Sequence, residues 1–434
     1  MRLWLIPTVY VGASVIGGLA LPRIEQAYLP SYTLNLSVAS AQAYLSAAAS
    51  GMMALTGIVF AMAFVMVQFS AIAYSPRLVL WFARDRVLFH SLGAFSATFL
   101  YALFTLAWVD RGASGTVPLL SSMIVAIMLI VSMLLFSRLV QRLSDLQITN
   151  VLHLTGDKGR EVIRDMFGRR EDKAAAAQEP GQRGAAAARL GPATQALRYS
   201  GEPRTIAKLD IEALVRHAQQ AGGVIVMMCA VGDTVVEGTL LLDIHGAESQ
   251  LPERVLMRAV HLERERTFEQ DPKYPIRLLV DIAIKALSPA INDPTTAVQT
   301  IDQIEDLLRR LGSHDLDAGY ASDANGVVRL IVPMPTWEDY LTLAFDEIRQ
   351  YGATSVQVIR RLRAALVGLT DSLSSAERAD AVRRYLEHLD LVIEHSTLDA
   401  EDRLMARQED RQGLGLSRGC AAATDRNKVS GPSR

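Results

Sequence analysis

The chain has 434 residues, of which half are hydrophobic and 21% charged, and its formal net charge is −2. This length allows two or three domains. The charge balance excludes nucleic acid as a dominant partner, because neutralising phosphates requires clustered lysine and arginine. The apolar residues are concentrated towards the N-terminus, so the composition predicts a membrane part followed by a water-soluble part.

The chain contains two cysteines, Cys229 and Cys420. The first lies in an apolar, strand-like run and the second in a polar tail. This placement argues against a disulfide framework, and it favours a reducing compartment.

Four apolar stretches of about 20 residues predict transmembrane helices. They cover residues 3–21, 52–73, 87–108 and 117–135. The first has an alternative, a cleaved signal peptide, because Gly18-Leu19-Ala20 offers small residues at the required spacing. Arginines set the predicted orientation: Arg2, Arg77, Arg84, Arg86, Arg138 and Arg142 fall on one side, and Arg23 and Arg111 on the other. The positive-inside rule then places both termini in the cytoplasm.

The second predicted span carries a stripe of small residues at helical spacing. Its members are Ala47, Gly51, Ala54, Gly57 and Ala61. Small side chains let another helix approach closely. The stripe therefore predicts a packing surface, used either by another span of the same subunit or by a second subunit.

Polar residues are sparse in the predicted spans. Gln68 and His90 lie near the span ends, where water can satisfy them. Strongly acidic or basic residues are missing from mid-membrane depth. This pattern argues against a proton-coupled pump or a substrate-binding transporter core, which place ionisable groups at the midplane. It leaves open a pore lined by small residues.

Composition shifts divide the chain further. Residues 169–193 mix alanine runs with charge, proline and glycine, and cannot support a core. The predicted parts are a four-helix transmembrane domain (1–145), a connecting helix (146–168), a flexible linker (169–200), a β-hairpin or barrel-sandwich-like segment (201–250), a helical cytoplasmic domain (251–397) and a disordered tail (398–434). The fold class is thus an α-helical membrane domain followed by a cytoplasmic α/β (α+β) domain with a helical C-terminal part.

The segment VGDTVVEGTLLLDI (231–244) predicts short strands with turns at Gly232-Asp233 and Glu237-Gly238. It is similar to half of a biotinyl or lipoyl carrier domain. Such a carrier needs a lysine on a tight turn soon afterwards, and His245-Gly246-Ala247-Glu248 follows instead. We therefore expect a hairpin scaffold without the carrier chemistry, and no cofactor.

A sharp polar corner joins two predicted helices of the soluble part. The first helix, residues 276–287, ends at Ser288-Pro289, because proline disfavours helix at the preceding residue. The second begins with Asp293 as N-cap and Pro294 at its first position, and ends at Gly312. The candidate binding residues at this corner are Lys285, Ser288, Asn292, Asp293 and Thr295.

The corner has two interpretations. The Asp293 carboxylate would already occupy the positive end of the second helix, which argues against an anion and suits a cation or a partner's backbone. In the alternative, Asn292 and Asp293 only cap and stiffen the turn.

Two long blocks of this sequence carry a family resemblance. LSPAINDPTTA, with ERERTFEQDPKYPIRLLVDIA before it, and RDRVLFHSLGAFSATFLYALFTL, with QFS and SPR before it, resemble the bacterial family of predicted membrane proteins filed as domain of unknown function 2254. The resemblance covers most of residues 1–395 and implies a multi-pass protein of the bacterial inner membrane. It carries over no catalytic residues, because the family has no established activity. Ala97 departs from the pattern, since glycine is expected there.

Motifs of known chemistry are missing from the sequence. GxSxG, HExxH, Walker and CxxC motifs do not occur, and the glycines at 413, 415 and 419 follow no predicted strand. We expect a non-enzymatic, homo-oligomeric protein that works in binding, sensing or channel and transport-related roles, with the lipid bilayer as partner. The alternative is a membrane-anchored enzyme with a polar site around Asn292 and Asp293, assisted by Lys285 and Glu265.

Overall fold

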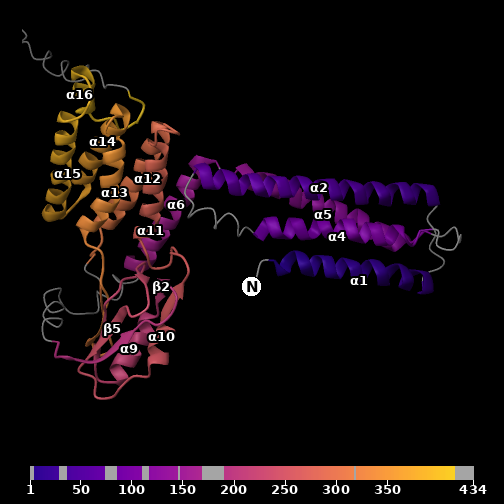
Figure 1. Cartoon of the computed structure of the whole chain (residues 1–434), viewed down its shortest axis with the longest axis horizontal. Helices are drawn as coiled ribbons and strands as arrows, with labels where there is room; N and C mark the ends of the chain where they lie inside the picture. The colour runs from indigo at the N-terminus through magenta and orange to yellow at the C-terminus, as the bar shows by residue number, and fades with distance from the viewer. Residues whose placement is uncertain are drawn as a thin grey trace, which may run out of the picture. The chain divides into compact units, whose positions relative to one another are not determined.

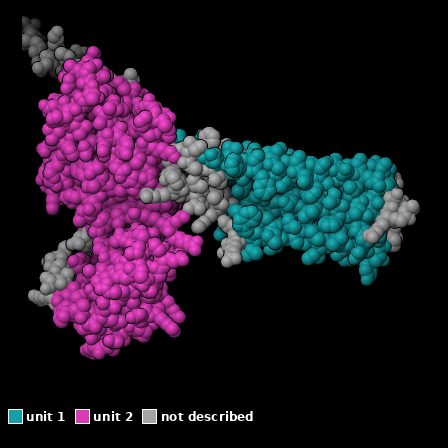
Figure 2. All heavy atoms as spheres, viewed as in Figure 1, with its two compact units in different colours: residues 1–151 teal, residues 152–434 magenta. Residues whose placement is uncertain are grey.

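The computed structural model describes residues 4–28, 37–73, 86–109, 117–144, 147–168, 190–316 and 319–415. The chain forms two compact units, residues 1–151 and 152–434 (Figure 2). Residues 169–189 of the predicted linker (169–200) and residues 416–434, with Cys420, lie outside the described residues. The described end of that predicted linker forms a strand at Ala193–Arg198, which corrects the expectation of a flexible segment there.

The N-terminal unit contains four long helices that lie side by side (Figure 1). They are α1 (Leu5–Tyr28), α2 (Val38–Ala73), α4 (Arg86–Leu106) and α5 (Leu119–Ser144). All four are long and apolar enough to cross a membrane, which confirms the four predicted candidate spans. Half of the span window of α4 is buried, against about a fifth for each of the others, so α4 is the central helix.

Two of these helices are longer than the sequence predicted. α1 continues through Pro22 to Tyr28, and α2 begins at Val38 rather than at residue 52. Proline is tolerated inside membrane helices because neighbouring helices help to satisfy the freed backbone groups. The first turns of α2 are rich in alanine and serine, so a hydropathy criterion misses them although alanine favours helix.

The C-terminal unit contains two β-sheets. The strands are β1 (Ala193–Arg198), β2 (Arg204–Leu209), β3 (Val224–Met227), β4 (Thr234–Val235), β5 (Leu240–His245), β6 (Val260–Glu263), β7 (Tyr320–Ser322) and β8 (Val328–Ile331). Their orders are β1-β5-β3-β8-β7 and β4-β2-β6. The helices α9 (Ile211–Gln220) and α10 (Glu253–Ala259) accompany them.

The predicted hairpin is divided between these sheets. β3 pairs antiparallel with β5, from Val224 opposite His245 to Met227 opposite Leu242. The turns at Gly232 and Gly238, both with positive φ, bracket β4, which pairs with β2 in the other sheet. β3 also pairs in parallel with β8. The five-stranded sheet therefore crosses the boundary that the sequence placed at residue 250, because its last strands come from beyond residue 319.

The second half of the unit is helical, as predicted (Figure 1). Its helices are α11 (Lys273–Ala286), α12 (Pro294–Gly312), α13 (Trp337–Tyr351), α14 (Val356–Ser372), α15 (Ala376–Glu394) and α16 (Ala400–Ala406). α12 packs against α11 and α14. The helix α6 (Ile148–Ile163), extended by the π-helical turn η1 (Arg164–Gly168), contacts α12 through its residues from His153 onward.

The expectation of a disordered tail from residue 398 is corrected for residues 400–415. α16 occupies the first part of this stretch. The carboxylate of Asp410, 4% exposed, then accepts backbone N–H groups from Gln412, Gly413 and Gly415 at 2.6–3.1 Å. Gln357 of α14 donates to the Gly413 carbonyl. A buried carboxylate thus organises a sequence whose polar, glycine-containing composition suggested a loose chain.

Candidate functional site

At the predicted corner, Asp293 acts as the cap of α12. Its Oδ1 accepts the Thr296 backbone N–H at 3.1 Å, and its Oδ2 accepts the Thr296 hydroxyl at 2.6 Å. Its own N–H donates to the Ala286 carbonyl at 2.8 Å. Both carboxylate oxygens are therefore engaged in holding the first turn of the helix, and Pro294 stands at the first helical position as predicted.

Asn292 has a conformational role in the same turn. Its φ is +48°, in the left-handed region that asparagine tolerates better than most residues. The Ser288 hydroxyl donates to the Lys285 carbonyl at 2.7 Å, which closes the end of α11. The side chains of Asn292 and Thr295 are exposed. The five candidate residues lie along the same turn, and Ser288 and Asp293 make the contacts of a capped turn.

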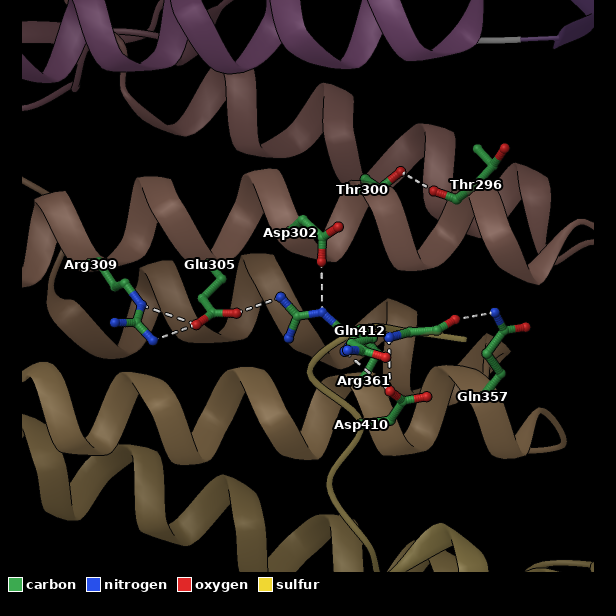
Figure 3. Close-up of polar contacts among 10 residues, drawn as sticks. Thr296, Thr300, Asp302, Glu305, Arg309, Gln357, Arg361, Asp410 and Gln412 are labelled. Carbon is green, nitrogen blue, oxygen red and sulfur yellow. Dashed lines mark hydrogen bonds and ion pairs between the residues drawn. The ribbon is translucent and has the colours of Figure 1, made fainter. Parts of the chain in front are cut away.

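A charged network on the same helix lies further along α12 (Figure 3). Arg361 of α14, 6% exposed, donates to Asp302 and to Glu305 at 2.6 Å each. Glu305 also accepts from Arg309. Removing one partner of such a network leaves an uncompensated charge, so these contacts fix how α12 and α14 pack. This network was not predicted from the sequence, although Glu305 and Arg309, four residues apart on one helix, are a local signal of an ion pair.

A cavity of about 550 Å³ lies beside the C-terminal end of α12. Its lining comes from α6 and η1 on one side and from the end of α12 on the other: Asp157, Arg160, Glu161, Ile163, Arg164, Gly168, Arg310, Ser313 and His314. Within it, Arg160 bonds Asp306 at 2.7 Å and Asp157 at 2.8 Å. The Phe167 ring stacks on His314, with centroids 5.6 Å apart. The lining offers charges of both signs.

Two glycines let α6 lie close to α12. A Cβ added at Gly156 would lie 2.2 Å from Oε1 of Gln303, and one at Gly159 would lie 2.7 Å from Cδ2 of the buried Leu307. A side chain at either position would require Gln303 or Leu307 to move. α6 is therefore packed, and not merely tethered, against the helix that forms the other wall of the cavity.

The interior of the four-helix unit contains several buried hydroxyls. Those of α4 are Ser91, Thr98 and Thr105, each 1% exposed or less. Thr98 lies 3.2 Å from the Ser132 hydroxyl of α5. Glu25 of α1 accepts the Leu120 and Ser121 N–H groups and the Ser121 hydroxyl at 2.6–3.1 Å, so it caps α5 from another helix. Glu25 was not among the predicted residues, because the first span was predicted to end at Leu21.

The polar and small residues singled out in the predicted spans differ in their contacts and exposure. His90 bonds the Tyr10 hydroxyl of α1 through Nδ1 at 3.2 Å, whereas Gln68 is exposed. The small-residue stripe is exposed at all five positions, and nothing lies within 4 Å of a Cβ added at Gly51 or Gly57. The close approach within this unit is instead between α1 and α4, where a Cβ at Gly18 would lie 2.8 Å from Phe104. Ala97, expected as glycine, is buried in the same region.

The charged run before α11 ends in a buried ion pair. Arg266 donates from Nε to Oδ2 of Asp271, which is 1% exposed, and burial raises the pKa of this carboxyl despite the arginine. A Cβ at Gly232 would clash with both side chains. Gly232 of the predicted turn thus lies so close to this ion pair that only glycine fits there. Glu265, proposed to assist the corner, is exposed.

Comparison with known proteins identifies the family of this chain. A family model described as "Predicted membrane protein (DUF2254)" matches residues 1–367. The chain belongs to this family. Two similar proteins are the uncharacterized proteins MT1328 and Rv1290c of Mycobacterium tuberculosis, each 25% identical over 417 residues, covering 93% of this chain and 78% of the relative. No solved structure matches. The recognised resemblance is confirmed, and the docked segment 400–415 lies outside the family match.

Proposed function

We propose that this DUF2254 protein is a membrane-anchored binding and sensing module, in which occupancy of the cavity beside α12 is transmitted through α6. One observation carries the proposal: α6, which follows the last candidate span with only residues 145–147 between, forms one wall of the cavity. A ligand that bridges Arg164 on η1 and Arg310 on α12 would bind one arrangement of the two helices better than another. Such differential affinity is what a ligand needs to shift a conformational equilibrium.

The contacts between α6 and α12 suit this role. Arg160 joins its own helix to Asp306, and Asp306 also accepts from Arg310 at 3.1 Å. A ligand group that displaces one of these arginines from Asp306 changes how the other is held. The cavity is of the size that small-molecule sites have, roughly 300–1,000 Å³. Charges of both signs in its lining favour a small polar ligand.

The test uses full-length protein with a fluorophore at Ser313→Cys, in a Cys229→Ala, Cys420→Ala background. Inorganic phosphate, succinate and putrescine are titrated as probes of anionic and cationic chemistry. We expect one class to saturate the signal, with binding weakened by Arg310→Gln and retained in Arg383→Gln, an exposed arginine of α15. Hydrogen exchange of α6 and the end of α5 should slow on binding. If no probe saturates, or if exchange changes only at α12, the sensing proposal is wrong.

The same proposal includes a homo-oligomer and an orientation. The exposed small-residue stripe of α2 supports self-association, since it is open in the chain itself. The arginine bias supports an inner-membrane protein with both termini in the cytoplasm. A cysteine at Ser114 should then react with a membrane-impermeant thiol reagent in cells with a permeabilised outer membrane, and one at Asp399 should not. The reverse labelling would invert the topology.

The enzyme alternative at Asn292 and Asp293 is not proposed further. The two hydrogen bonds that Asp293 accepts from Thr296 support a capping role, and no observation favours catalysis there.

A further inference from the structure

Both carboxylates in the lining of the cavity beside α12 are already paired. Asp157 accepts from Arg160 at 2.8 Å, and Glu161 accepts from Lys158 at 2.6 Å. The pKa of Glu161 is lowered chiefly by its bond to Lys158, and Arg164 contributes least to that shift. Among the described lining residues, a cationic ligand therefore finds no carboxylate without a partner.

Two arginines of the lining, in contrast, keep donors that bond no described residue. The guanidinium of Arg164 on η1 forms neither a hydrogen bond nor an ion pair with the described part of the chain. Arg310 on α12 bonds Asp306 through Nε alone, at 3.1 and 3.2 Å, which leaves its two Nη atoms for a ligand. The charge available in this cavity is thus positive, and it comes from both walls.

Guanidinium groups are selective for oxyanions. Their planar, forked N–H donors match two oxygens of a carboxylate or of a phosphate, and bonds between ionised partners are the stronger hydrogen bonds. The available donors of Arg164 and Arg310 therefore favour a ligand with a carboxylate or phosphate group over an amine.

The cavity has room for more than one such group. Its volume of about 550 Å³ lies in the range of sites for whole small molecules, roughly 300–1,000 Å³. His314 lines the same cavity, and its ring lies nearly parallel to that of Phe167, at 14°. Phe167 is 2% exposed, so it fixes the plane of the His314 ring from the protein side. Aromatic rings held in this way are surfaces on which flat ligand rings stack.

One short segment supplies both features. The π-helical turn η1 carries Arg164 at its start and Phe167 near its end. Such turns are rare and are frequent at functional sites. We infer that the cavity binds an oxyanion that carries a flat ring, as nucleoside monophosphates and aromatic carboxylates do, with Arg164 and Arg310 on the oxyanion and His314 against the ring. This inference rests on the site of the proposed function and names the chemical class of its ligand.

The test is isothermal titration calorimetry of the full-length protein in detergent. AMP, GMP and benzoate carry both a ring and a negative charge, glycerol phosphate and succinate lack the ring, adenosine lacks the charge, and putrescine is a cation. We expect at least one ring-bearing anion to bind roughly tenfold more tightly than every other probe. Tighter binding of a nucleotide identifies a phosphate ligand, and tighter binding of benzoate identifies a carboxylate.

Variants separate the two contacts. Arg164→Gln should weaken binding of the ring-bearing anion roughly tenfold, whereas Arg383→Gln, at an exposed arginine of α15, should leave it unchanged. His314→Ala should weaken the ring-bearing anion and leave glycerol phosphate as it was. His314→Phe should restore the ring-bearing anion, because it supplies another flat ring. Thermal unfolding without ligand shows that each variant is folded.

Three results would overturn the inference. They are ring-bearing anions that bind no more tightly than glycerol phosphate, putrescine that binds more tightly than any anion, and His314→Phe that is as weak as His314→Ala. Hydrogen exchange separates this failure from that of the sensing proposal. Binding of a ring-bearing anion without slower exchange in α6 contradicts sensing alone, and slower exchange caused by putrescine alone contradicts only the ligand class.

Discussion

The Oδ2 atom of Asp293 lies 2.6 Å from the Thr296 hydroxyl, and its Oδ1 lies 3.1 Å from the Thr296 backbone nitrogen. One carboxylate thus holds both polar groups of the same residue, three positions into α12. These two contacts give Asp293 a structural role at the corner that the sequence marks as a candidate binding site.

This relationship predicts the order of two substitutions. Asp293→Ser should change the free energy of unfolding little, because serine caps about as well as aspartate, whereas Asp293→Ala should lower it by about 0.5–2 kcal/mol. Chemical denaturation of the purified protein measures both. Equal losses in the two variants would mean that the charge itself is needed, and would return the corner to the candidate binding sites.

The packing of α6 on α12 predicts a large effect at Gly159. Gly159→Leu should lower the free energy of unfolding by about 1–3 kcal/mol, because overpacking against the buried Leu307 forces a shift. Lys158→Leu introduces the same side chain at the neighbouring, 41% exposed position and should be close to neutral. Denaturation midpoints compare the two. Similar midpoints would show that the close approach of the helices is not needed for stability.

Asp323 predicts a pH dependence. The Arg329 guanidinium, with the N–H groups of Val327 and Asn325, holds the pKa of this carboxyl below its usual value. The unfolded chain, with a pKa of about 3.9, therefore takes up the proton first as the pH falls. Stability from this group is present above that value and is lost as the pH drops through the folded pKa. The free energy of unfolding is measured from neutral pH down to below about 3.9. It should fall less steeply with falling pH in Asp323→Asn than in the wild type, and as steeply as in the wild type in the exposed Asp380→Asn.

The open stripe of α2 predicts an effect on assembly without an effect on the fold. Gly57→Ile adds a bulky side chain where nothing lies within 4 Å of the new Cβ, so the chain itself should fold normally. If a second copy packs there, the dimer should dissociate, because close helix approach needs small residues. Light scattering in detergent measures the mass, and Met133→Phe on the exposed face of α5 serves as control. An unchanged mass in Gly57→Ile would exclude the stripe as the interface.

Local signals account for the features that the sequence predicted well. A 20-residue apolar run, or an aspartate followed by proline, acts within a few residues, and both α12 and the four spans were found in this way. Non-local contacts account for the rest. In the sequence, nothing distinguishes Arg361 from the other arginines of its helix. Only the fold brings it to Asp302 and Glu305. Glu25 likewise becomes a cap only when α5 lies beside α1.

The parallel pairing of β3 with β8, Ile225 beside Leu330 and Val226 beside Ile331, sets an order of events during synthesis. When β3 leaves the ribosome, its partner is still about a hundred residues from being made, and α11 and α12 must emerge first. The edge of β3 that later binds β8 is unpaired in the meantime, and unpaired edges invite association with other chains. An expression fragment that stops before residue 328 would keep this edge permanently, so soluble fragments of this protein should run at least to Ile331.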